Sequence, residues 1–180
     1  MPSDSQTAIL QSVQANYPAI DKAAGVFLQK LTGTDISRDI TLAAEMSGLA
    51  LLRQGTADVS KMPPGMAVLG AVPDDALETL QKFVVGWAAS NRIDFRMANP
   101  AGLPKDKTAY LPELTKFELP FRTICLEQGI APGLIPFVAA TSALKLVLAG
   151  NQLKLIDIST ALAIVMFHVV AGAKMVPHPL

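Results

Sequence analysis

The sequence predicts an all-α protein, a compact bundle of about seven helices, and three observations support this fold class. Along most of the chain, apolar residues recur at the three- and four-residue spacing of a buried helix face, and almost nowhere do they alternate as in a half-buried strand. Prolines and glycines mark the boundaries between these segments. Hydrophobic residues make up 51% of the 180 residues, which is ample material for one core.

Three helices are expected before residue 55. The first covers about residues 3–16, and the second begins near Pro18, because proline suits the first turn of a helix. Gly33 is the expected end of the second helix, and the third covers about residues 35–54. Small residues are frequent in the third helix, so a neighbouring helix is expected to pack closely against it. They are Ala43, Ala44, Ser47, Gly48 and Ala50.

The middle of the chain predicts one clear helix. Residues 61–65 include two prolines and a glycine, which break helical structure. The apolar run 66–72 is either a buried turn of helix or a short strand, because its length does not distinguish the two. The clear helix covers about residues 73–94, and Asp75 and Glu78 have the spacing of a capping pair at its start.

Residues 95–111 predict a long irregular loop, rich in glycine, proline and polar residues. Loops of this length are uncommon inside compact domains, and many are functional lids. Neither flanking part is expected to be large enough to fold alone. We therefore expect a single helical domain over residues 1–180, with two halves, 1–94 and 112–180, joined by the loop.

The last third of the chain predicts an apolar pair of helices. Short helical pieces at 113–117 and 120–128 come first, and helices at about 136–149 and 157–174 follow. Only four residues are charged from position 129 onward, but each uncharged run has sixteen residues, fewer than the ~20 that a spanning helix needs. We expect the pair at the centre of the bundle or at an interface, and a membrane hairpin is the disfavoured alternative.

Segments 43–55 and 139–150 resemble each other weakly. Each is rich in alanine and leucine, ends at a glycine, and is soon followed by Asp-Val-Ser or Asp-Ile-Ser. Two related halves would pack about a pseudo-twofold axis, although a match this short between common helix residues also arises by chance.

Charge and cysteine content narrow the functional classes. Fifteen basic and fifteen acidic residues balance, and no Lys/Arg cluster predicts nucleic-acid binding. Cys125 is the only cysteine, which excludes an intrachain disulfide, and its apolar neighbours predict a packed thiol rather than a nucleophile. The first residues lack the pattern of a secretory signal, so a cytoplasmic location is expected.

Polar residues gather where the helix 73–94 is expected to end. Arg92 and Arg96 would suit a carboxylate or another anion, although cations at a helix end also favour the dipole without any ligand. His168 lies in an apolar helix without a second histidine at a metal-binding spacing, so a hydrogen-bonded core histidine is favoured over a metal ligand. No metal or cofactor is expected. The ligand-binding candidates are Trp87, Asn91, Arg92, Asp94, Arg96 and His168.

The leading functional hypothesis is a non-enzymatic interaction protein that forms homo-oligomers or binds a protein partner through apolar helix faces. This hypothesis rests on the C-terminal helix pair, which has few charges and more apolar surface than the core is expected to need. A protein that binds an apolar small molecule between its helices is the alternative. An enzyme with a site near Asn91, Arg92 and Asp94 is a third hypothesis, but no catalytic motif identifies its residues.

Overall fold

The computed structural model confirms the predicted fold class. It describes residues 4–31, 35–55, 58–68, 70–94, 96, 98 and 111–177. The helices in this part of the chain are α1 (Asp4–Ala15), α2 (Tyr17–Leu28), α3 (Ile36–Leu52), α4 (Asp74–Ser90), α5 (Leu111–Glu127), α6 (Ile135–Gln152) and α7 (Ile158–Lys174). Two single turns of 3₁₀ helix, η1 (Val59–Lys61) and η4 (Pro132–Leu134), complete the regular structure of the described residues.

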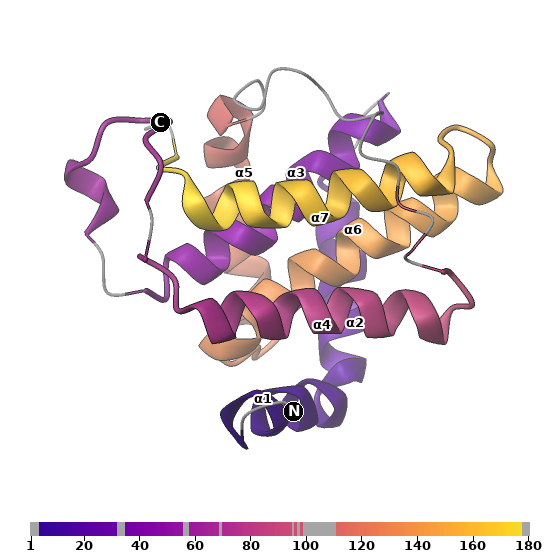
Figure 1. The fold of residues 1–180 in the computed structure, drawn as a ribbon, viewed down its shortest axis with the longest axis horizontal. Helices are drawn as coiled ribbons and strands as arrows, with labels where there is room; N and C mark the ends of the chain where they lie inside the picture. Colours follow the sequence, from indigo (N-terminus) through magenta and orange to yellow (C-terminus); the bar gives the residue numbers. More distant parts are fainter. Residues whose placement is uncertain are drawn as a thin grey trace.

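Helices α3 and α6 form the centre of the bundle. Helix α3 packs against both α6 and α7, and α6 also packs against α2 and α4. Figure 1 shows α4 and α7 on the near side of this centre, with α2 and α5 behind it and α1 at the lower edge. Most residues of α6 and α7 are buried. The apolar C-terminal pair therefore belongs to the core of the chain itself.

Helices α3 and α7 cross in direct backbone contact at two glycines. A Cβ atom at Gly48 would lie 2.2 Å from the carbonyl oxygen of Val169, and one at Gly172 would lie 2.1 Å from the carbonyl oxygen of Glu45. Both separations are far below van der Waals contact, so neither position admits a side chain at this spacing. The small residues of α3 thus correctly predicted a close neighbour, and that neighbour is α7.

Two predicted helix boundaries are wrong. Pro120 lies inside α5, which is one continuous helix where two short pieces were expected. A proline removes one backbone donor and disturbs the preceding turn, but tertiary packing on both sides outweighs that cost here. Gly150 lies inside α6 and does not end it. A Cβ atom at Gly150 would lie 2.8 Å from Cγ2 of Ile156 and 3.0 Å from Cγ1 of Ile36 on α3, so close packing accounts for the glycine at this position.

The described residues of the apolar run 66–72 form a single bridge rather than a helix or a strand. Ala67 and Met175 form an isolated antiparallel bridge. The amide of Val68 donates to the carbonyl of Lys174 at 2.7 Å, and the amide of Val176 donates to the carbonyl of Met66 at 2.9 Å. These hydrogen bonds join the segment before α4 to the end of α7 and the residues that follow it.

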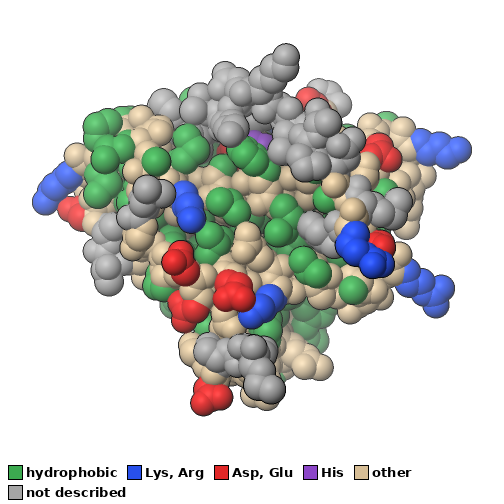
Figure 2. Space-filling view, viewed as in Figure 1, with side chains coloured by type: hydrophobic (Ala, Val, Ile, Leu, Met, Phe, Trp, Pro, Cys, Tyr) green, Lys and Arg blue, Asp and Glu red, His purple; other side chains and the backbone are tan. Residues whose placement is uncertain are grey.

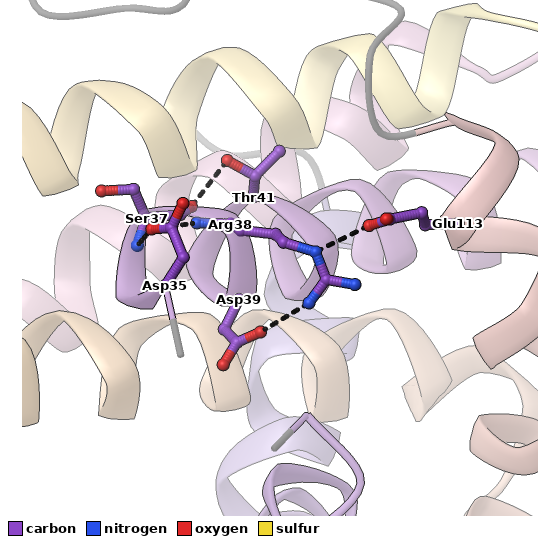
Figure 3. Close-up of polar contacts among 6 residues, drawn as sticks. All are labelled: Asp35, Ser37, Arg38, Asp39, Thr41 and Glu113. Carbon is purple, nitrogen blue, oxygen red and sulfur yellow. Dashed lines mark hydrogen bonds and ion pairs between the residues drawn. The ribbon is translucent and has the colours of Figure 1, made fainter. Parts of the chain in front are cut away.

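Capping and an ion pair fix the start of α3, as Figure 3 shows. The Asp35 carboxylate accepts from the amides of Ser37 at 2.9 Å and Arg38 at 3.2 Å. The Nε atom of Arg38 donates to Oε2 of Glu113 on α5 at 2.7 Å. Asp35 therefore caps α3, and Arg38 in its first turn joins α3 to α5.

The loop predicted over residues 95–111 lies outside the described residues, apart from positions 96, 98 and 111, the last of which begins α5. The proposed stop at Gly33 also lies outside them.

One described segment, Pro132–Gln152, is long and apolar enough to cross a membrane by length and composition alone. It consists of η4 and α6, and 67% of its most apolar stretch is buried inside the fold. Helix α7 is also apolar, but it is shorter than the length required of a membrane-spanning helix. The central position of α6 is sufficient to explain its apolar composition.

Candidate functional site

A groove of about 720 Å³ lies between α4 on one side and α1 with the first residues of α2 on the other. We call it the α1–α4 groove. Its volume is within the range of small-molecule sites, and its lining is more apolar than polar. The apolar residues are Leu10, Val13, Tyr17, Pro18, Phe83, Gly86 and Trp87, and the polar ones are Gln14, Lys82, Ser90 and Asn91.

Polar contacts join α4 to α1 at one end of the groove and to Tyr17, the first residue of α2, at the other. At one end, Gln6 donates to Oε2 of Glu78 at 3.0 Å and accepts from the Lys82 ammonium at 3.0 Å. At the other end, the indole N–H of Trp87 donates to the Tyr17 hydroxyl at 2.7 Å. The order of these contacts shows that α1 and α4 run in the same direction, with the groove between them.

Glu78 takes part in the polar contacts between α1 and α4 instead of capping α4. The helix begins after Pro73 without a side-chain cap, so the predicted capping pair of Asp75 and Glu78 is wrong. Hydrogen bonds from Lys82 and then from Gln6 lower the pKa of the Glu78 carboxyl. The carboxylate is charged at neutral pH and balances the Lys82 ammonium, which lies 2.8 Å from its Oε1 atom.

Gly86 leaves the groove open at its midpoint. A Cβ atom at this position would have no heavy atom within 4 Å. A glycine inside a helix costs roughly 0.5–1 kcal/mol relative to alanine. The glycine therefore keeps this part of the groove open, although a larger side chain that favours the helix would fit at the same position.

The six predicted site residues lie in three places. Trp87 and Asn91 line the α1–α4 groove. Arg92, Asp94 and Arg96 line a separate surface depression of about 490 Å³ beyond the end of α4. His168 is buried in the core. The structure therefore does not bring Asn91, Arg92, Asp94 and His168 into one site.

The two arginines at the end of α4 have different local roles. Arg96 forms a bidentate pair with Asp94, with Nε–Oδ1 at 3.0 Å and Nη2–Oδ2 at 2.8 Å, and this pairing lowers the pKa of Asp94. Arg92 has a left-handed φ of 61° and ends the helix. The amide of Ile93 then bonds back to the carbonyl of Ala88 at 2.9 Å. The anion-binding fork of Arg96 is thus already occupied by a carboxylate.

Figure 2 shows basic and acidic side chains interspersed over one face of the described molecule, with hydrophobic side chains between them. A basic stripe of the kind that follows a nucleic-acid backbone is not present among the described residues of that face.

The core contains a fully buried acid–base pair. Glu45 on α3 and His168 on α7 are both 0% exposed, and their Oε1 and Nδ1 atoms lie 2.8 Å apart. The pair lies beside the crossing of Gly48 and Gly172. The prediction of a hydrogen-bonded core histidine is confirmed. Glu45 was missed, although a carboxylate among the small and apolar residues of α3 was a signal in the sequence.

Burial raises the pKa of Glu45, while the hydrogen bond and charge of His168 act in the opposite direction with smaller effect. Oε2 of Glu45 and Oγ1 of Thr141 have no hydrogen-bond partner within the described residues. No group of three or more potential metal ligands occurs in that part of the chain. The pair is therefore a buried, hydrogen-bonded carboxyl–imidazole pair that does not belong to a metal-ligand cluster in that part of the chain.

Cys125 is a packed thiol, as predicted. Its side chain is fully buried, and burial raises its pKa to about 12. It remains protonated at neutral pH and is a poor nucleophile.

Comparisons with protein-family models, curated proteins and solved structures find no match to this chain. The fold and site define the class of protein: an all-α bundle with an apolar groove on its surface and an acid–base pair in its core.

Proposed function

We propose that this protein binds a neutral, largely apolar small molecule in the α1–α4 groove and is not an enzyme. The observation that carries the proposal is the composition of the groove: three aromatic side chains, Tyr17, Phe83 and Trp87, in a space of about 720 Å³. Apolar clefts with a few polar groups at the edge are typical of small-molecule sites.

The polar groups of the groove favour a neutral ligand that carries a hydrogen-bond donor. Lys82 is neutralised by Glu78, so the site has little net charge. Ser90 donates its hydroxyl to the carbonyl of Gly86, and Asn91 donates one of its two amide hydrogens to the carbonyl of Trp87. The amide oxygen of Asn91 remains an acceptor at the edge of an apolar surface. A hydroxyl or amine on a flat apolar body matches this arrangement.

The probe 1-aminoanthracene, a neutral flat amine, tests the proposal. Trp87 is the only tryptophan, so its fluorescence reports directly on the groove. We expect saturable probe binding with quenching of Trp87 emission. Native mass spectrometry of freshly purified protein would show in addition whether a compound of the same class is retained.

Gly86→Leu fills the groove while improving helix propensity, and Gly25→Leu is the matched control. Gly25 also lies inside a helix with no heavy atom within 4 Å of a Cβ position, but it does not line the groove. Probe affinity should fall about tenfold or more in the first variant and stay unchanged in the second. Equal affinities in both variants would refute the proposal.

Self-association is a second candidate, and a feature of α5 favours it. Leu119 and Leu126 lie two helical turns apart and are 70% and 80% exposed. This spacing places them on one face, which would suit a helix–helix dimer contact. The C-terminal helix pair is already part of the core, so α5 is the better site for such a contact.

Sedimentation velocity tests the second candidate. The wild-type chain should form dimers at high micromolar concentration, and the double variant Leu119→Glu/Leu126→Glu should be monomeric. A wild-type chain that stays monomeric at that concentration removes the candidate. A cytoplasmic location fits either function, because the only cysteine is a free buried thiol.

A further inference from the structure

A second cavity, smaller and more enclosed than the α1–α4 groove, lies between α3, α5 and the start of α6. Its volume is about 150 Å³, and we call it the α3–α5 cavity. Met46, Leu49 and Phe121 provide apolar lining, and Arg53, Glu118 and Arg122 provide charged groups. It shares no lining residue with the groove.

The charged groups of the cavity carry an excess positive charge. Arg53 binds Glu118 in a bidentate pair, with Nε–Oε1 at 2.8 Å and Nη2–Oε2 at 2.9 Å, so both oxygens of that carboxylate are engaged. Arg122 lies one turn after Glu118 and forms no ion pair within the described residues. Two guanidinium groups and one carboxylate leave one positive charge beside the apolar lining.

The size and charge of the cavity together define a ligand class. An apolar cavity of about 150 Å³ is large enough to hold benzene. A carboxylate on a body of that size would pair with Arg122, since charge-assisted hydrogen bonds between guanidinium and carboxylate are among the stronger ones in proteins. The apolar body would replace water at Met46, Leu49 and Phe121, where water has few polar partners.

We propose that the α3–α5 cavity is a binding site for a small organic monoanion, a carboxylate with an apolar body about the size of a benzene ring. Arg122 is the anion-binding residue, and the Arg53–Glu118 pair fixes the wall of the site. The site is independent of the function proposed for the groove.

Titration of the full chain with benzoate, followed by amide chemical shifts at constant ionic strength, tests this proposal. Saturable shifts are expected for residues 46–54 of α3 and its end and for residues 118–122 of α5. Benzyl alcohol, of similar shape but neutral, should bind about tenfold more weakly because it lacks the charge that pairs with Arg122.

Arg122→Gln removes the proposed anion partner, and Lys116→Gln removes an equal charge from an exposed position of α5 outside the cavity. Benzoate affinity should fall about tenfold in the first variant and be unchanged in the second. Gly86→Leu should also leave it unchanged. Equal binding of benzoate and benzyl alcohol, equal loss in the two charge variants, or no saturable shift in the wild type would overturn the proposal.

Discussion

The Glu45–His168 pair carries a large desolvation cost, because each side chain must leave water completely. Both residues are 0% exposed, and each offers the other a partner at 2.8 Å. Removing one partner leaves the other polar group buried without its acid–base counterpart. Replacing both with apolar side chains removes the desolvation penalty together with the attraction.

A double-mutant cycle measures this coupling. Glu45→Met or His168→Leu alone should lower the free energy of unfolding by about 1–3 kcal/mol, because the remaining buried polar group loses this hydrogen bond. The double variant should be more stable than the sum of the single effects predicts, because neither partner is then left behind. Urea denaturation of the four proteins gives the coupling energy. Additive effects would show that the two residues do not stabilise each other.

The raised pKa of Glu45 gives the fold a specific pH dependence. In the folded state the carboxyl keeps its proton to higher pH than in the unfolded chain, whose value is near 4.5. Its contribution to stability is complete below the unfolded pKa and is lost as the pH rises through the folded pKa. The stability of the wild type relative to Glu45→Gln should therefore decrease with rising pH over that window.

Urea denaturation of the wild type and Glu45→Gln across mildly acidic to neutral pH measures this difference. The glutamine keeps a hydrogen-bonding group beside His168 but does not titrate. A difference in unfolding free energy that stays constant with pH, or that grows in favour of the wild type as the pH rises, would contradict the prediction.

At the scale of whole helices, the crossing of α3 and α7 brings two backbones into direct contact. Gly48→Ala would bring a Cβ atom to 2.2 Å from a backbone oxygen, and backbone cannot move aside as a flexible side chain can. We expect a loss of unfolding free energy on the order of 3 kcal/mol or more, since the helices must separate. Thermal unfolding followed by circular dichroism measures it.

Gly25→Ala is the control for this helix substitution. Its Cβ atom meets no heavy atom within 4 Å, so the same chemical change should raise stability by about 0.5–1 kcal/mol through helix propensity alone. Equal shifts of the unfolding temperature in the two variants would mean that the crossing does not limit the approach of α3 and α7.

The helices were predictable because their signals are local, whereas several of their boundaries were not. The spacing of apolar residues predicted every helix of the described part in outline. Gly150 was mistaken for a helix end because sequence spacing does not show that Ile156 and the distant Ile36 both pack against this position. Pro120 was mistaken for a helix start because propensity alone does not reveal that packing holds a helix together around a proline.

Only the α4 side of the candidate groove could be predicted from the sequence. Trp87 and Asn91 come from the polar end of a clear helix, but Tyr17 and Val13 reach the same groove only because α1 packs beside α4. Glu45 was missed for a similar reason, since its partner is 123 residues away. Sequence spacing reveals neighbours on one helix and is silent about which helices meet.

At the scale of the whole molecule, stability should be unevenly distributed. Helices α3, α6 and α7 are packed on several sides, whereas α1 lies at the edge and packs mainly on α4 and α2. Few residues of α1 are buried, and Gln6 and Val13 are the two that are. A helix with so little buried surface depends on its polar contacts and opens more easily than the core.

This uneven distribution gives the last prediction, which concerns Gln6→Ala. The substitution removes the bonds to Glu78 and Lys82 at one end of the α1–α4 groove while leaving the Tyr17–Trp87 contact in place. Amide hydrogen exchange should become faster in α1 by about tenfold, the factor expected for a loss of 1.4 kcal/mol, and stay unchanged in α3 and α6. Binding of 1-aminoanthracene should weaken in parallel, because α1 forms one wall of the groove. If α1 and α3 lose protection together, the helix is part of one cooperative unit with the core. The groove would then be as rigid as the bundle, and ligand entry would not depend on the motion of α1.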